Sequence, residues 1–195
     1  MTGDRYRSFA ALKASEREGI DYRIVVVDRR APVTVIAPHG GRIEPPTSRL
    51  ALAIAGETCN AYCFEGLQPD REHHDLHITS DNFDEPIACE LVARSDVVVA
   101  VHGRLDRDDP EAVWLGGLDV DLCNRVADAL RRAGFGTLTE GHMFPGSGPR
   151  NICNCGLRRM GVQLELPRGL RDVLAREESD FERFVTAVRS GIGLI

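Results

Sequence analysis

The chain has 195 residues, of which 43% are hydrophobic, and a net charge of −6 at pH 7. This length and apolar content are sufficient for one domain with a full core, so we expect residues 1–195 to form a single domain. No segment approaches the roughly 18 apolar residues of a membrane span, and the first residues lack the pattern of an export signal. The basic residues are scattered, which argues against nucleic-acid and membrane partners. We therefore expect a soluble, cytoplasmic protein.

The six cysteines include no C-x-x-C pair and no pattern typical of a small disulfide-bonded scaffold. This usage favours free thiols in a reducing compartment over disulfides or a structural zinc bound by cysteines.

The first third of the chain alternates between helical and strand-like patterns. An amphipathic pattern stopped by a glycine indicates a first helix, and two β-branched runs indicate strands joined by a hairpin or a short crossover. A Pro-Pro-Thr-Ser segment marks the start of a second helix, and another strand follows it. The expected elements are a helix over 5–18, strands over 22–27 and 33–36, a helix from 47 to 56 and a strand over 58–64.

The rest of the chain continues the alternation. An unbroken apolar run that ends in His-Gly is typical of a central parallel strand, over residues 96–103. Alternating strands and helices predict an α/β fold, a three-layer αβα arrangement around a mixed, mostly parallel sheet. The other expected elements are strands over 75–79, 135–139 and 162–166, helices over 83–94, 119–132 and 177–190, and loops over 66–72 and 140–160.

A candidate metal-binding loop, A-P-H-G-G-R-I-E over residues 37–44, directly follows the second strand. In open α/β sheets, ligands bind beyond the carboxyl ends of the strands, which is where His39 and Glu44 are placed. Two glycines let the backbone turn sharply enough to bring the imidazole and the carboxylate together around one ion. A buried histidine beside a surface glutamate is the alternative interpretation.

A second strand also ends in histidine and glycine, at His102. If the two strands are parallel neighbours, His39, Glu44 and His102 meet at one edge of the sheet as a His2Glu zinc site with an open fourth position. A hydrolytic zinc enzyme also needs a general base. Glu165 is a candidate because it lies between two leucines, where desolvation would raise its pKa. An outward-facing strand residue is the alternative for Glu165.

Five strings in this order resemble the poly-γ-glutamate hydrolase family of bacteriophages and bacterial genomes. They are A-P-H-G-G-R-I-E, D-L-H-I-T-S-D-N-F-D-E-P, V-V-V-A-V-H-G-R, N-I-C-N and G-V-Q-L-E-L-P-R-G-L-R. The resemblance implies a fold like that of zinc carboxypeptidases, one Zn²⁺ ion, and endo-type hydrolysis of γ-glutamyl amide bonds. By position it also implies that His39, Glu44 and His102 bind the metal and that Glu165 is the general acid/base.

Further residues are candidates for substrate contacts. Arg150 is expected to stabilise the oxyanion or hold a substrate carboxylate, with Asn151 beside it. His77 is expected to contact the substrate or to support a metal ligand, and His142 to line the cleft. Glu140 is a rival to Glu165, whereas His73 and His74 are expected to be solvated.

An anionic polymer substrate would need arginines near the cleft, because the protein itself is negatively charged. Two alternatives to a polyglutamate hydrolase stay open. One is another zinc amidohydrolase or carboxypeptidase-like enzyme, acting on a peptidoglycan stem or an N-acylated amino acid, since G-V-Q-L-E-L is also similar to N-formylglutamate amidohydrolases. The other is a noncatalytic phage-associated protein. The arginines that flank the motifs are Arg42, Arg104, Arg107, Arg150, Arg158 and Arg168.

Overall fold

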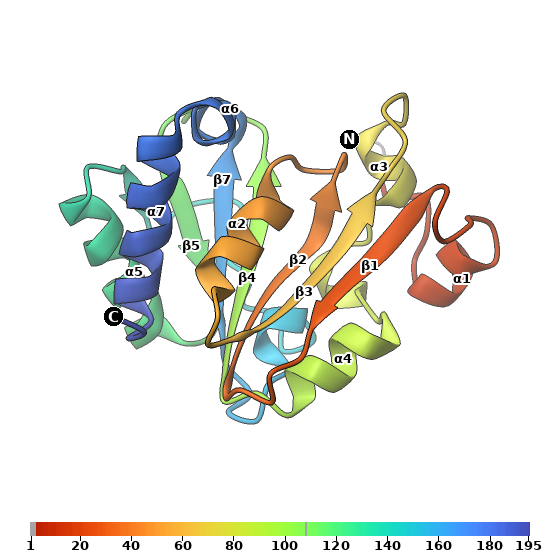
Figure 1. Ribbon diagram of the computed structural model, residues 1–195, viewed down its shortest axis with the longest axis horizontal. Coiled ribbons are helices and arrows are strands. Elements are labelled where there is room, and N and C mark those ends of the chain that lie inside the picture. Colours follow the sequence, from red (N-terminus) through yellow and green to blue (C-terminus); the bar gives the residue numbers. More distant parts are fainter. Residues whose placement is uncertain (1–2, 108) are drawn as a thin grey trace.

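A seven-stranded sheet forms the centre of the protein in a computed structural model that describes residues 3–107 and 109–195 (Figure 1). The strand order is β1-β3-β2-β4-β7-β5-β6. Helices cover both faces, which confirms the predicted α/β fold class. The strands are β1 (Tyr22–Val27), β2 (Val33–Gly41), β3 (Asn60–Gly66), β4 (Val97–Arg104), β5 (Val113–Gly116), β6 (Thr137–Leu138) and β7 (Val162–Pro167).

The sheet is mixed, with a parallel centre. Strands β3, β2, β4 and β7 are parallel neighbours, whereas β1 runs antiparallel to β3 and β5 runs antiparallel to β7. Of the two connections expected between the first two strands, a hairpin or a short crossover, the hairpin is wrong, because β3 lies between β1 and β2. The side chain of Asn60 in β3 bonds the backbone of Arg29 and Ala31, so the connection between β1 and β2 is fixed to β3.

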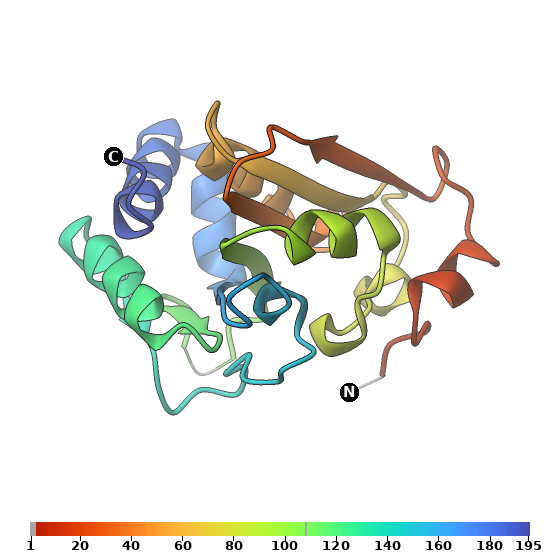
Figure 2. The same ribbon diagram turned by 90° about the horizontal axis from the view of Figure 1, so that it is seen from below.

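Helices α2, α5 and α7 bury their apolar sides against one face of the sheet, and α1, α4 and η2 against the other (Figures 1 and 2). Helix α6 lies beyond the carboxyl end of β7 (Figure 1). In the part of the chain that the structure describes, no helix is long and apolar enough to cross a bilayer. The helices are α1 (Phe9–Lys13), α2 (Thr47–Ala55), α3 (His73–Leu76), α4 (Pro86–Ala93), α5 (Val120–Arg132), α6 (Arg168–Arg176) and α7 (Glu178–Gly191), with 3-10 turns η1 (Ser80–Asn82) and η2 (Ile152–Asn154).

The segment around residue 75 differs from its prediction. The expected strand over 75–79 is wrong, because residues 73–76 form the short helix α3. Glu72 and Asp75 make reciprocal bonds to each other's backbone N–H groups, a capping box that stabilises a helical turn. The turn ends at His77, whose backbone is extended. As a result, His73 and His77 both lie near Glu44 instead of alternating along a strand.

One other predicted element has a different extent, and two elements of the structure were not predicted. The N-terminal helix is confined to Phe9–Lys13, because the Ser8 side chain accepts a hydrogen bond from Ala11 N and fixes its start. Strand β5 and helix α6 were not predicted. Strand β5 is only four residues long, and α6 follows β7 without an intervening loop, so neither has a clear boundary in the sequence.

Candidate metal centre

The two histidine-glycine sequences come together at the carboxyl ends of β2 and β4, which are parallel neighbours. The Nδ1 atoms of His39 and His102 are 3.1 Å apart, and Oε2 of Glu44 is 3.4 Å from Nδ1 of His39. All three residues are almost fully buried, with exposed fractions of 2%, 2% and 4% for His39, His102 and Glu44. His39 therefore lies close to both other members of the predicted triad.

Each side chain of the triad is held from outside the cluster. Nε2–H of His39 donates to the carbonyl of Ile78 at 2.8 Å, which leaves the Nδ1 lone pair directed inward. Nε2 of His102 lies 3.4 Å from Oγ of Ser80. The N–H of Gly103 donates to Oε2 of Glu44 at 2.7 Å. Metal-binding histidines usually have such an outer partner, which fixes the tautomer and the ring orientation.

His73 is exposed, as predicted, but it also contacts this region. Its side chain is 51% exposed, but its Nε2 lies 3.0 Å from Oε1 of Glu44. Sequence reasoning missed this contact because the two residues are 29 positions apart. The contact means that both carboxylate oxygens of Glu44 have partners.

His77 brings a third imidazole to the cluster. Its ring centroid is 3.9 Å from that of His39, and its Nε2 is 4.0 Å from Oε1 of Glu44. His39, Glu44 and His77 each offer a ligand atom, and these atoms all lie within 4.8 Å of one another. On its outer side, Nδ1 of His77 bonds to Oδ1 of Asp4 at 2.6 Å. Asp4 gave no signal in the sequence, because it lies 73 residues away in the segment before α1.

The electrostatics reflect this crowding of imidazoles around one carboxylate. Burial would raise the pKa of Glu44, but His39 and His73 outweigh this effect and hold it well below its ordinary value. Burial would likewise lower the pKa of His39, but the carboxylate of Glu44 outweighs burial and raises it. Burial and the nearby His39 lower the pKa of His102 to about 3 and that of His77 to about 4. The latter two rings are therefore neutral near pH 7, as metal ligands must be.

Glu165 of β7 lies directly beside His102 in the parallel register of β4 and β7. Paired residues of neighbouring strands point to the same face, so this carboxylate faces the same side of the sheet as His102. Nε2 of Gln163 donates to Oε1 of Glu165 at 3.1 Å. Burial and the charge of Glu44 raise the pKa of Glu165 well above its ordinary value. A carboxyl group with a raised pKa is suited to exchange protons at neutral pH.

Asn151 supports Gln163 from inside the protein. Nδ2 of Asn151 donates to Oε1 of Gln163 at 2.9 Å, and Asn151 is only 5% exposed. The side-chain amide of Asn151 is therefore already bonded to Gln163, the residue that donates to Glu165. Arg150, the residue before Asn151, is exposed and has no ion pair within the described residues.

His142 lies on the other side of Glu165. Its Nε2–H donates to the carbonyl of Leu115 at 2.8 Å, and its ring stacks on Trp114 at 5.4 Å. Trp114 in turn is the antiparallel neighbour of Glu165. Glu140, the rival of Glu165, is exposed. The aromatic rings of Trp114 and His142 are thus beside the candidate general base, whereas Glu140 has no described contact with it.

Four of the six arginines predicted to flank the motifs fall into two groups. Arg104 is buried, donates to four backbone carbonyls and stacks over Trp114 at 3.6 Å, and Arg158 pairs with Asp119. Arg42 and Arg168 are exposed, with no ion pair in residues 3–107 and 109–195. Arg42 is two residues from Glu44 and is therefore the exposed cation nearest to the cluster in sequence.

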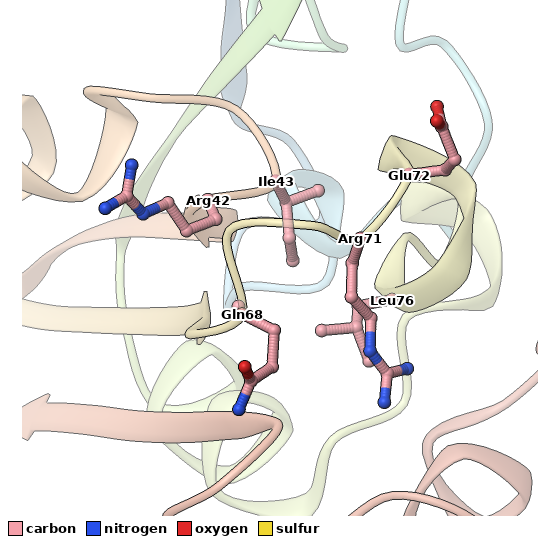
Figure 3. A pocket seen from close by; sticks show the side chains of 7 residues that line it. Arg42, Ile43, Gln68, Arg71, Glu72 and Leu76 are labelled. Atoms are coloured by element: carbon pink, nitrogen blue, oxygen red, sulfur yellow. The ribbon is translucent and has the colours of Figure 1, made fainter.

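Two surface hollows adjoin the loop that carries Glu44. The smaller one has Ile43 and Leu76 in its wall, and Figure 3 shows the Arg42 side chain extending away from them. The larger one has a volume of about 340 Å³. Arg42 borders both hollows. The residues lining the larger hollow are Arg23, Gly41, Arg42, Pro45, Glu65, Gly66 and Leu67.

The donor set fits a zinc ion. In a tetrahedral zinc site with bonds of roughly 2.0–2.2 Å, neighbouring ligand atoms are about 3.3–3.6 Å apart. The separations of 3.4 Å between Glu44 and His39 and 3.1 Å between the two histidines are close to this spacing. Two imidazoles and one carboxylate are also a ligand set that zinc hydrolases use.

The family model of poly-γ-glutamate hydrolases matches residues 6–187. The chain belongs to the poly-γ-glutamate hydrolase family. It is 34% identical, over 98% of its length, to the SPbeta prophage-derived UPF0714 protein YoqZ of Bacillus subtilis (strain 168), and it spans 66% of that relative. This confirms the resemblance noted from the sequence motifs.

Three solved structures agree with this fold. A bacteriophage poly-γ-glutamate hydrolase superimposes with a TM-score of 0.91 and 28% identity, over 96% of both chains. The zinc-free form of YndL superimposes with a TM-score of 0.87 and 31% identity, over 97% of both chains. A putative carboxypeptidase of Burkholderia mallei shares the fold at a TM-score of 0.50 and 17% identity, over 88% of this chain and 60% of that one.

Proposed function

We propose that this protein is a zinc-dependent hydrolase that cleaves the γ-glutamyl amide bonds of poly-γ-glutamate. The observation that carries the proposal is that Nδ1 of His39 lies 3.1 Å from Nδ1 of His102 and 3.4 Å from Oε2 of Glu44, with Glu165 beside His102 in register. Membership of the poly-γ-glutamate hydrolase family, together with a relative solved in a form named for its lack of zinc, supports the substrate and the metal.

The metal would be held by Nδ1 of His39, a carboxylate oxygen of Glu44 and Nδ1 of His102. A zinc ion bound there would act as a Lewis acid and lower the pKa of water toward about 7. Glu165 would take a proton from the attacking water and return it to the leaving nitrogen. Gln163, bonded to Oε1 at 3.1 Å, keeps the carboxylate of Glu165 in one orientation during this exchange.

The substrate carries one carboxylate per residue, so its recognition requires cations near the cleft. Arg42 is suited to this role because it is exposed, has no ion pair within the described residues and borders a hollow of about 340 Å³. A guanidinium binds a carboxylate through two parallel hydrogen bonds. Arg150 and Arg168 are further exposed cations that could bind more distant carboxylates of the chain.

The test is the Glu165→Gln variant, assayed on poly-γ-glutamate by polymer length and analysed for bound zinc. We expect kcat to fall by about 10²–10⁴-fold, the usual contribution of a general acid/base, with the zinc content unchanged. Glu140→Gln is the matched control and should retain activity. Loss of zinc in Glu165→Gln would instead make Glu165 a metal ligand. Intact polymer after incubation with zinc-loaded wild-type protein would refute the proposed substrate.

A further inference from the structure

His77 has one ring nitrogen whose role the proposed triad does not explain. Nδ1 lies 2.6 Å from Oδ1 of Asp4, whose other oxygen accepts from the N–H and the hydroxyl of Thr79, both at 2.6 Å. A carboxylate with these donors is an acceptor only, so Nδ1 of His77 carries the hydrogen. Nε2 then has a lone pair, and within the described residues it makes no hydrogen bond.

The lone pair of His77 faces another acceptor. Nε2 is 4.0 Å from Oε1 of Glu44, and the ring packs on His39 with a centroid distance of 3.9 Å. A lone pair and a carboxylate oxygen repel each other unless a hydrogen or a cation lies between them. The His77 side chain is only 18% exposed, so solvent does little to screen this repulsion. A metal ion shared by His77 and Glu44 would turn the repulsion into an attraction.

We propose that His77 is a fourth protein ligand of the metal and that Asp4 is the residue that positions it. This inference rests on the proposed metal centre. All three histidines then follow one scheme, in which one ring nitrogen faces the ion and the other faces an oxygen, from Ile78, Ser80 or Asp4. The separation of 4.0 Å is longer than a tetrahedral edge, so His77 is the most weakly held and most easily displaced ligand. Catalytic zinc sites expand to five ligands in the transition state, which leaves room for water and substrate.

The arrangement assigns a role to the segment before α1. Asp4 reaches the centre because Arg5 N donates to the carbonyl of His74 at 3.2 Å and the Asp4 carboxylate is bonded to Thr79. The metal centre therefore includes a contribution from outside the sheet. Displacing this segment would release His77 without moving His39, Glu44 or His102.

The test is zinc affinity, measured by competition with a chromophoric chelator on metal-stripped protein. We expect His77→Ala and Asp4→Ala to bind zinc at least tenfold more weakly than wild type, since loss of an outer-sphere partner alone costs 10–100-fold. His74→Ala is the matched control, because the His74 ring has no described contact with the cluster, and it should bind as wild type does. Circular dichroism of the metal-free proteins checks that each variant is folded.

The visible spectrum of the cobalt-loaded proteins provides a second readout that does not depend on activity. Removing one ligand changes the ligand field, so the bands of His77→Ala and Asp4→Ala should differ from those of wild type and His74→Ala. Unchanged affinity and superimposable cobalt spectra in His77→Ala would overturn the inference while leaving the triad intact. Failure of wild-type protein to bind zinc would refute the proposed function itself.

Discussion

Arg171 of α6 ties together the three strand ends that carry the candidate site. Its Nη1 donates to the carbonyl of Pro45 at 2.5 Å, its Nε to Leu166 at 3.2 Å and its Nη2 to Arg104 at 3.2 Å. These carbonyls belong to the segments that end β2, β7 and β4. Arg171 is only 7% exposed, and burial lowers its pKa. We predict that Arg171→Met destabilises the protein strongly.

The expected size follows from the number of bonds lost. A hydrogen bond from a charged group contributes about 1.5–3 kcal/mol, and three would give about 5–9 kcal/mol if they were additive. Methionine fills most of the volume and some carbonyls regain water, so we expect a loss of about 3–5 kcal/mol, similar to that of a broken buried ion pair. For a domain of this size the melting temperature would fall by about 6–20 °C.

Thermal unfolding followed by circular dichroism at pH 7 measures this effect. Arg176→Met is the matched control, because Arg176 is an exposed arginine on the same helix, and its loss should change stability by less than about 0.5 kcal/mol. Equal melting temperatures for Arg171→Met and Arg176→Met would show that the three carbonyls are satisfied without the guanidinium, and the reasoning would fail.

Three other predictions concern the proton-transfer residue, acid stability and the thiols. Gln163→Leu should lower kcat on poly-γ-glutamate by about 10–100-fold with little change in KM, because the Glu165 carboxylate loses its orienting bond; an unchanged kcat would contradict this role. The Arg71 guanidinium holds the pKa of buried Glu16 below its ordinary value, so the stabilisation is present above about pH 4.3 and is lost as the pH falls through the lowered value. Urea unfolding of Glu16→Gln should therefore show a deficit of about 2 kcal/mol at pH 7 that shrinks as the pH falls below about 4.3 toward the lowered pKa of Glu16. Burial raises the pKa of the Cys63 and Cys123 thiols to about 12, so Ellman's reagent should leave both unreacted until the protein is denatured.

The sequence was sufficient to predict the inner part of the candidate site. Both histidines follow apolar strand runs and precede glycine, and the carboxyl ends of parallel neighbours must meet at one edge of the sheet, which brought His39 and His102 together. Glu165 lies beside His102 in register, but its strand pattern alone left an outward-facing position open, and the family resemblance pointed to it as the general acid/base. Local sequence patterns therefore predicted the positions of those side chains that the regular backbone of the sheet determines.

The outer part of the site could not be predicted in this way. Asp4 and His73 reach the cluster from short or irregular segments, where no periodicity indicates which way a side chain points. The strand expected over 75–79 was wrong for the same reason, since its alternation of apolar and polar residues over five positions was outweighed by a capping box. Asn151 looked like a loop residue but is bonded to Gln163, a contact between segments that a strand pattern does not reveal.

The two edge strands of the sheet differ in how readily a strand of another molecule can pair with them. On one side the sheet ends in β6, a strand of two residues that offers almost no backbone for pairing. On the other side β1 presents six residues, including the 38% exposed Val26, so intermolecular strand addition would begin there. Charged residues at Arg23 and Asp28 flank the apolar centre of β1, and such gatekeeper residues slow aggregation.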